Sequence, residues 1–304
     1  MWIINNRKIF YAFSIVLVLA SILSLAIWGV KPGIDFTGGT LIEIGYSGHM
    51  PSQSSVLSVA SSVDSAASVR PFGEDAYIIK MKPLTQEEKA IVMESLLSET
   101  DGVIANGSST PVLNNYASIG PILGAEALRK ALVSIFLVIV AIVLFITFAF
   151  RKVSAPVSSW KYGLVAIAAL AHDVIIPTGL FSILGHLAGY EVDTLFITAL
   201  LVILGFSVHD TIVVFDRVRE NLRLSSPGKP FRQVVGESIS QTFTRSINTS
   251  LTTLIALVVL YFFGGSATEH FSLVLIVGIA AGTYSSIFIG SPLLVTIEKW
   301  GKKK

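Results

Sequence analysis

The sequence predicts an α-helical membrane protein with six spans and one small α+β domain outside the bilayer. Of its 304 residues, 52% are hydrophobic and only 14% are charged, with a mean hydropathy of +0.73. Soluble domains carry about 25% charged residues, so this composition is typical of a chain embedded in lipid. Six apolar runs have membrane-crossing length, and a polar, serine-rich stretch separates the first run from the second.

The spans are defined by apolar length and by the charged residues that end them. They are predicted at 9–30, 131–150, 162–187, 195–215, about 246–263 and about 271–297. The first run ends in Ala26-Ile27-Trp28-Gly29 without the small-x-small site of a signal peptide, so we interpret it as an uncleaved helix. The polar segment 216–244 follows the fourth span, and 231–244 is predicted to form an amphipathic helix on the membrane surface.

Residues 31–128 are predicted to fold as a separate domain between the first span, in 1–30, and the helical bundle of 129–304. Its predicted elements, in chain order, are a strand at 40–46, a helix at 52–63, strands at 68–72 and 76–81, a helix at 85–99 and a closing strand at 102–105. Thr85 and Glu88 match a capping box. The expected apolar face of the last helix consists of Leu84, Ile91, Met93, Leu96 and Leu97. This order is that of a ferredoxin-like split β-α-β sandwich, and nothing in it has a catalytic pattern.

Charge predicts the orientation of the chain. Six spans put both termini on one side, and the basic residues around the predicted span ends gather on that side. The two short loops on the other side, 185–193 and 264–270, contain no Lys or Arg. The positive-inside rule therefore places both termini and the 216–244 segment in the cytoplasm, and residues 31–128 outside.

Asp210 is the first candidate functional residue, because it lies inside the fourth apolar run. It is six positions before Asp216, where the charged residues begin, and so about 9 Å from that boundary at about 1.5 Å per residue. A carboxylate in hydrocarbon costs roughly a few kcal/mol and usually marks an ion pathway. The pattern predicts a titratable relay, with a structural acid that pins helices as the alternative.

Arg245 is the predicted partner of Asp210, because it starts the fifth span at a similar depth. A snorkelling interface arginine is the alternative. Polar residues at helical spacing around it predict a buried polar seam. They are Thr242, Arg245, Thr249, Thr252 and Thr253.

His172 and Asp173 lie near the middle of the third span, the most costly depth for a charge. Pro177 removes the helical partner of the Asp173 carbonyl, which predicts a kinked, partly hydrated helix there. An ion-coupling role and a purely structural polar contact both remain open for this pair. For His209, beside Asp210, proton passage and simple packing are equally compatible with the sequence.

Several other classes of protein are excluded by their missing motifs. The glycine-rich 33–40 segment has no Gly-Lys-Ser/Thr after it, so it is not a phosphate loop. No His-Glu-x-x-His zinc motif, no Gly-x-Gly-Asp protease loop, no cysteine and no nucleic-acid motif occurs. Gly278, Gly282, Ser286 and Gly290 recur every four residues and predict a close helix-packing face, internal or for a partner.

Four stretches together resemble the SecF family, the smaller of two related membrane subunits that assist bacterial protein translocation. They are GIDFTGGT at 33–40, AHDVII at 171–176, GFSVHDTIVVFDRVREN at 205–221 and RSINTSLTTL at 245–254. The resemblance covers nearly the whole chain. It implies an RND-like half with six spans, the relay acid at Asp210 and its arginine at Arg245. Other motif or structural positions are Gly33, Asp35, Phe36, Gly38, Gly39, Asp216, Arg217, Glu220 and Asn221.

The resemblance also implies partners and a location. These are SecD, the SecYEG channel, YajC and unfolded preproteins, in the lipid of the bacterial cytoplasmic (inner) membrane. It implies a motor that uses a proton gradient, or in some members sodium, with no other cofactor, no metal and no enzymatic reaction. His209 replaces an expected asparagine, and Pro177 an expected non-proline. The rival functions are an RND-type small-molecule exporter and a non-transporting scaffold at the channel.

Overall fold

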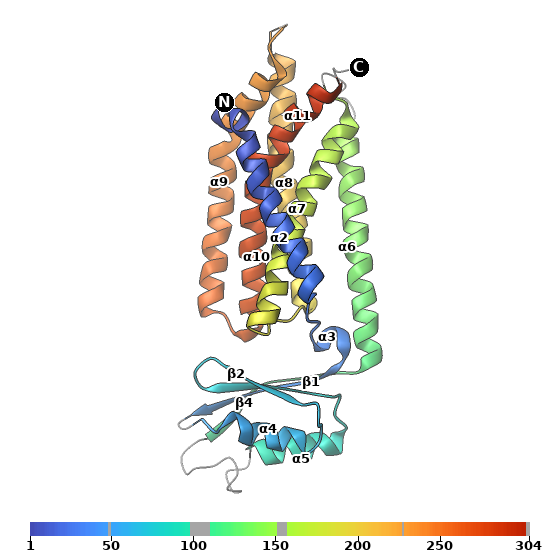
Figure 1. Ribbon diagram of the computed structural model, residues 1–304, viewed down its shortest axis with the longest axis vertical. Coiled ribbons are helices and arrows are strands. Elements are labelled where there is room, and N and C mark those ends of the chain that lie inside the picture. Colours follow the sequence, from blue (N-terminus) through green and yellow to red (C-terminus); the bar gives the residue numbers. More distant parts are fainter. Residues whose placement is uncertain (48–49, 98–109, 151–156, 227, 302–304) are drawn as a thin grey trace. The chain divides into compact units, whose positions relative to one another are not determined.

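The apolar runs form helices, because a chain in hydrocarbon must satisfy its backbone groups internally. The computed structural model describes all residues except 48–49, 98–109, 151–156, 227 and 302–304. In the described residues, six helices are long and apolar enough to span a membrane (Figure 1). They are α2 (Arg7–Trp28), α6 (Pro121–Ala149), α7 (Ser159–Leu187), α8 (Thr194–Leu224), α9 (Phe231–Phe263) and a sixth that combines α10 (Ser266–Ser285), η1 (Ser286–Gly290) and α11 (Ser291–Gly301).

The chain forms two units, a helical unit of Met1–Lys31 with Leu132–Lys304 and a small α+β unit of Pro32–Ala131. Within the helical unit, α7, α8 and α10 are half-buried or more, whereas α2, α6 and α9 expose most of their surface. A short helix, α1 (Trp2–Asn5), precedes α2. The stacked rings of Phe150 and Tyr162, both against Phe215, lie in the buried core. The spans that contain α7, α8 and α10 are therefore the most buried of the six.

The helices extend beyond the predicted spans. The fourth continues nine residues past Phe215 to Leu224, and α6 begins at Pro121 rather than at 131. The separate surface helix predicted at 231–244 is wrong, because α9 runs without a break from Phe231 to Phe263. Figure 1 shows a bend in α9, and Thr242 donates to the Ser238 and Ile239 carbonyls, a contact that bends helices. Polar residues end a membrane span without ending the helix that carries it.

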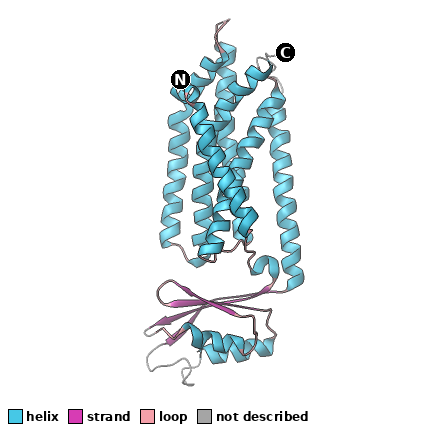
Figure 2. Cartoon of the chain, viewed as in Figure 1, coloured by secondary structure: helices cyan, strands magenta, loops and turns pink. Residues whose placement is uncertain are grey.

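The small unit is a four-stranded antiparallel sheet with helices, as its alternating sequence predicts (Figure 2). Its elements are α3 (Ile34–Thr37), β1 (Gly39–Ser47), α4 (Gln53–Ser61), β2 (Ser68–Phe72), β3 (Ala76–Met81), α5 (Gln86–Leu97) and β4 (Thr110–Ile119). The strand order β2-β3-β1-β4 places β1 in the middle, next to β3 and β4. This is the order of a split β-α-β sandwich.

The details of this unit refine the predictions. Both bonds of the capping box form, from the Thr85 N–H to Glu88 Oε2 at 2.9 Å and from the Glu88 N–H to Thr85 Oγ1 at 3.2 Å. The predicted apolar face is partly wrong, since Val92 and Leu96 are buried whereas Ile91 is 55% exposed. The closing strand predicted at 102–105 lies outside the described residues, and the last strand of the described sheet is β4, which pairs with β1.

Candidate functional site

Asp210 is buried on α8 and faces α9. Its side chain is 6% exposed, and Ser246 Oγ donates a hydrogen bond to Asp210 Oδ1 at 2.6 Å. The other oxygen, Oδ2, is also buried, and no group in the described part of the chain bonds to it. Since a buried polar atom without a partner carries a desolvation cost, Oδ2 is where a proton or an ion would be stabilised.

The predicted ion pair between Asp210 and Arg245 is wrong for the isolated chain. Arg245 is exposed, and no ion pair joins it to Asp210 among the residues the structure describes. Neighbouring residues in a helix point about 100° apart, so an inward Ser246 directs Arg245 outward. The predicted seam is partly wrong for the same reason, since only Thr242 of its members is buried. Thr249 and Thr252 are exposed, and the buried line on α9 is Ser238, Thr242, Ser246 and Ser250.

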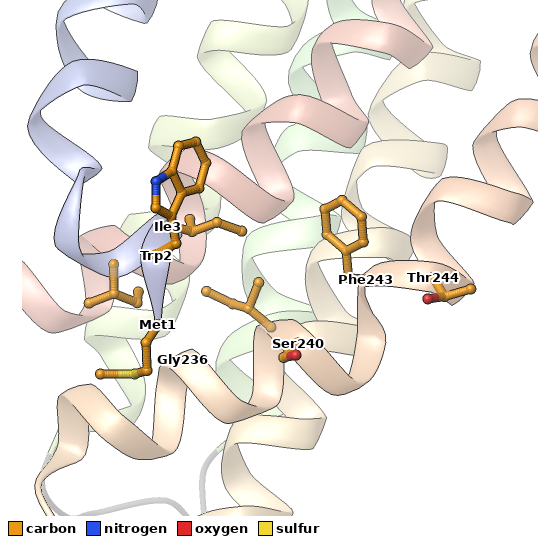
Figure 3. Close-up of a pocket in the computed structure, with 9 residues that line it drawn as sticks. Met1, Trp2, Ile3, Gly236, Ser240, Phe243 and Thr244 are labelled. Atoms are coloured by element: carbon orange, nitrogen blue, oxygen red, sulfur yellow. The ribbon is translucent and has the colours of Figure 1, made fainter.

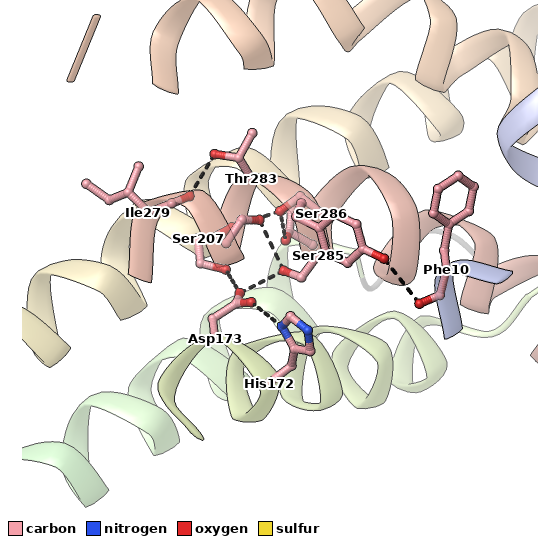
Figure 4. A network of polar contacts seen from close by, with 11 residues as sticks. Phe10, His172, Asp173, Ser207, Ile279, Thr283, Ser285 and Ser286 are labelled. Atoms are coloured by element: carbon pink, nitrogen blue, oxygen red, sulfur yellow. Dashed lines mark hydrogen bonds and ion pairs between the residues drawn. The ribbon is translucent and has the colours of Figure 1, made fainter. Parts of the chain in front are cut away.

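Asp173 is the more deeply buried acid, with no exposed surface (Figure 4). Its Oδ1 lies 2.8 Å from His172 Nδ1, and its Oδ2 accepts hydrogen bonds from Ser207 Oγ and, at 2.8 Å, from Ser285 Oγ. These donors come from α7, α8 and α10, so a single carboxylate connects the three interior helices. The predicted coupling residues His172 and Asp173 are thus brought together, in a cluster separate from the Asp210–Ser246 contact.

Further hydroxyls extend both clusters along α10. Thr211 Oγ1 lies 2.8 Å from Ser286 Oγ, which also donates to the Ser207 carbonyl at 3.5 Å. On the α9 side, Ser250 Oγ lies 2.5 Å from Thr283 Oγ1. Serine and threonine can donate and accept in turn, so these contacts form a polar lining between helices that are otherwise apolar.

The glycines of α10 permit this close approach. A Cβ on Gly278 would lie 2.1 Å from Ile203 Cδ1, and one on Gly282 would lie 3.1 Å from Ser207 Cβ. The glycine-rich face therefore packs internally against α8, which decides between the two alternatives left by the sequence. The π-helix η1 starts immediately after Ser285, and π-helical turns occur frequently at functional sites.

Two other predicted residues take less central positions. His209 is exposed although it is adjacent to Asp210, so it lies on another face of α8. Pro177 lies inside α7, which continues through it to Leu187, and Thr178 Oγ1 donates to the Val174 carbonyl at 2.7 Å. The hydration predicted near Asp173 and any proton passage through His209 stay predictions.

The charged motif after the fourth span joins α8 to α9. Arg217 donates to Glu220 and to Gln241 Oε1, both at 2.6 Å. Asn221 Nδ2 donates to Gln241 and to Ser238 Oγ, both at 2.8 Å. Asp216 pairs with Arg219. The contacts to Gln241 and Ser238 hold together the ends of the two helices that carry Asp210 and Ser246, whereas the Asp216–Arg219 pair lies within α8.

The glycine motif shapes the start of the small unit. Gly38 and Gly39 have φ of +73° and +139°, which side chains rarely adopt. A Cβ on Gly38 would lie 2.8 Å from Pro121 Cα, at the first turn of α6. Gly33 precedes α3, in which Asp35 occupies the first turn and Phe36 is 6% exposed. The motif is therefore a close backbone crossing of α3, β1 and α6.

Sequence reasoning missed the serines that hold the two acids, namely Ser207, Ser246 and Ser285. Each is completely or almost completely buried. Serine is small and frequent in membrane helices, so its presence alone marks nothing. The spacing of four between Ser238, Thr242, Ser246 and Ser250 is the signal that could have identified the α9 face.

A cavity of about 400 Å³ lies elsewhere in the helical unit, between the N-terminal residues and α9 (Figure 3). It is lined by Met1, Trp2, Ile3, Ile4, Gly236, Ile239, Ser240, Phe243 and Thr244. No acidic or basic side chain lines it. The cavity is therefore separate from both acid clusters.

The fold and its buried acids define a multi-span membrane protein with an intramembrane polar site and a small split β-α-β domain. Residues 103–300 match the family described as protein export membrane protein SecD/SecF, C-terminal, and residues 24–48 match the SecD/SecF GG motif. The chain is 40% identical to the protein translocase subunit SecF of Thermobaculum terrenum, over 97% of this chain and 93% of that protein. It is 33% identical to the SecF of Vibrio alginolyticus, over 95% and 87%.

Similarity extends to a longer protein and to its structure. The chain is 32% identical to the SecDF of Thermus thermophilus, over 97% of this chain but only 39% of that protein. The crystal structure of that translocon-associated membrane protein matches 98% of this chain with a TM-score of 0.77 and 30% identity. The chain belongs to the SecD/SecF family, on the SecF side. Its role is that of an accessory subunit of Sec protein export, in transport rather than in catalysis.

Proposed function

We propose that the subunit uses the proton-motive force to drive a late step of preprotein export, with Asp210 as the coupling acid. The observation that carries the proposal is the buried Oδ2 of Asp210, to which no described residue bonds. Its other oxygen is bonded to a different helix through Ser246. Loading or releasing a proton at Asp210 therefore changes a contact between α8 and α9, which is a way to convert a proton gradient into helix movement.

The size of each step follows from the gradient. One elementary charge crossing the membrane is worth about 2.3 kcal/mol per 100 mV. A single proton therefore gives a modest push, and repeated cycles move a chain outward. A sodium ion that bound the same carboxylate would supply the same energy per charge from the membrane potential.

SecD is the partner that we propose for the exposed face of α9. That helix presents Arg245, Asn248 and Thr252 to its surroundings within an apolar span. Exposed polar side chains are unfavourable against lipid tails, so another protein surface covers them. In the SecDF of Thermus thermophilus, the part matching this chain is fused to additional sequence, which supports SecD association. The other partners that we propose are the SecYEG channel, YajC, membrane lipid and unfolded preproteins.

We place the subunit in the bacterial cytoplasmic membrane with both termini in the cytoplasm. The helices α2 and α11 begin and end, respectively, at the same end of the helical unit (Figure 1). That end also carries Arg217, Arg219 and Arg223 at the end of α8. The connections at 188–193 and 264–265 contain no Lys or Arg, as the positive-inside rule requires of the outer side.

The experiment is gradient-dependent preprotein export in membrane vesicles that carry Asp210→Asn. Asparagine keeps an acceptor for Ser246 but cannot exchange a proton. We expect loss of the gradient-dependent component while export without a gradient persists. Asp216→Asn is the matched control, since it removes an acid of the same helix whose side chain is 53% exposed.

Co-purification with SecD checks that the variant assembles. Unchanged export by an assembled Asp210→Asn complex would remove the relay and favour a scaffold at the channel.

A further inference from the structure

His172 carries a buried nitrogen that the coupling scheme above does not use. The imidazole is 6% exposed, and Nε2 has no hydrogen-bond partner among the described residues. Its other nitrogen, Nδ1, lies 2.8 Å from Asp173 Oδ1. Because the carboxylate accepts, Nδ1 must carry a hydrogen, and in the neutral ring that leaves Nε2 as a bare acceptor.

The hydrogen bonds around Asp173 are those of an ionised carboxylate. Oδ1 faces His172 Nδ1, and both Ser207 and Ser285 donate to Oδ2. An isolated anion at this depth is costly unless a positive charge accompanies it. Among the described residues, His172 is the only group that forms an ion-pair contact with Asp173.

In the described part of the elements packed around the pair, no other cationic side chain is in ion-pair contact with it. Tyr284 of α10 stacks on His172 with a centroid distance of 6.2 Å and donates from its hydroxyl to the Phe10 carbonyl of α2. On α8, the buried titratable residue is Asp210, a second acid rather than a cation. In α2, Tyr11 bonds to Thr296 of α11 instead, η1 has no titratable residue, and Glu298 lies near the end of α11.

We propose that the Asp173–His172 pair is a second proton-binding site, distinct from Asp210, and that the proton is held at His172 Nε2. Binding converts the imidazole to imidazolium while Nδ1–H stays on Asp173, so the net charge of the pair changes from −1 to 0. The inference deepens the proposed proton-coupled function and rests on it for its role in export.

The site is placed where such a change reaches three helices. The carboxylate that accepts from His172 on α7 also accepts from Ser207 on α8 and Ser285 on α10. Ser285 is the last residue before η1. A change in the charge of the pair therefore alters the strength of the bonds that connect α7, α8 and α10.

The test is nitrogen-15 NMR of the histidine rings in the assembled complex with SecD, as a function of pH. The chain has five histidines, and the His172 signal is the one that His172→Asn removes. In the wild type, we expect this ring to change from the neutral to the doubly protonated form as pH falls. Asp210→Asn should retain the change, whereas Asp173→Asn should move it to lower pH because the counter-charge is gone.

His172→Asn is the discriminating variant for export. The asparagine amide nitrogen can replace Nδ1 as a donor to Asp173, but the variant has no Nε2 to protonate. We expect the variant to assemble with SecD. We also expect it to lose the part of the pH dependence of export that arises from protonation of His172 in the wild type. If His172 serves only as a structural donor, His172→Asn should keep the wild-type pH profile, and the proposal is wrong.

The two hypotheses fail separately. A ring that stays neutral at every pH at which the complex remains assembled overturns the second site, even if Asp210→Asn abolishes gradient-dependent export. Conversely, normal export by Asp210→Asn with a titrating His172 rejects Asp210 as the coupling acid and leaves the second site standing.

Discussion

Asp173 and Asp210, two buried acids of the helical unit, differ in how their oxygens are satisfied. Asp173 uses both oxygens, with contacts to a histidine and two serines. Asp210 uses one, in its bond with Ser246. The low dielectric of the interior penalises an unpaired polar atom. The Asp173 carboxylate is therefore held firmly by its partners, whereas the Asp210 carboxylate has one oxygen left open to proton exchange.

A third acid, Glu88 of the small unit, gives a prediction about pH. Its hydrogen bond with Lys82 and that with the Thr85 N–H lower the pKa of this carboxyl from 4.5 to about 2. A lowered pKa means that the stabilisation is complete above about pH 4.5 and is lost as the pH falls through about 2. We expect Glu88→Gln to reduce the hydrogen-exchange protection of α5 at neutral pH, and the difference from the wild type to vanish towards pH 2.

Glu87→Gln is the control for this measurement, since Glu87 is the exposed neighbour in the same first turn. Equal protection of α5 in Glu88→Gln and wild type at neutral pH would show that the capping box adds no stability.

At the scale of the elements, small residues decide how closely the helices approach. Ser24 Oγ of α2 donates to the Gly179 carbonyl of α7 at 2.9 Å, and Ser182 Oγ donates back to the Ser24 carbonyl at 2.9 Å. A Cβ on Gly179 would lie 2.5 Å from the Cα of Ser21. This contact involves backbone, so it cannot be relieved by a side-chain rotation.

We therefore predict that Gly179→Ala destabilises the helical unit by separating α2 from α7. Overpacking of this kind costs about 1–3 kcal/mol. The measurement is the thermal unfolding midpoint of the protein purified in detergent, which should fall.

Gly205→Ala is the matched control, because Gly205 lies in a membrane helix with no atom within 4 Å of the added Cβ. Its midpoint should stay the same or rise, since alanine favours a helix by about 1 kcal/mol over glycine. A Gly179→Ala midpoint equal to that of Gly205→Ala would contradict the close contact.

At the scale of the whole molecule, the number of spans and the distribution of charge predict the orientation. The chain has no cysteine, so single-cysteine variants report one position each. Ala188 lies in the connection between α7 and α8, and Ser226 in that between α8 and α9. We predict that a membrane-impermeant maleimide labels Ala188→Cys from outside intact cells and labels Ser226→Cys only in inverted vesicles.

Labelling of both variants from the same side would contradict a span formed by α8. Labelling with the sides exchanged would keep six spans but reverse the orientation inferred from the basic residues.

The sequence by itself determined the class of fold and the acids of the site. The length of an apolar run is a local property, and it predicted the six spans. The alternation of apolar and polar residues is also local, and it predicted the strands β1, β2 and β3. The cost of a charge in lipid singled out Asp210 and Asp173 without any structure. Helix ends were less predictable, because α8 and α9 continue beyond the predicted spans along polar residues, and many polar residues favour helices as much as apolar ones do.

Only the tertiary structure decided which side chains the acids contact. Ser246 and Arg245 are adjacent in α9, and so point about 100° apart around the helix axis. Ser246 bonds to Asp210, whereas Arg245 is exposed. The sequence shows that both are near, but the direction of a side chain depends on how each helix is rotated against its neighbours. That rotation is set by close packing across helices far apart in the chain, such as Gly278 against Ile203. A local pattern can therefore mark the polar face of one helix but not the side chain that this face meets.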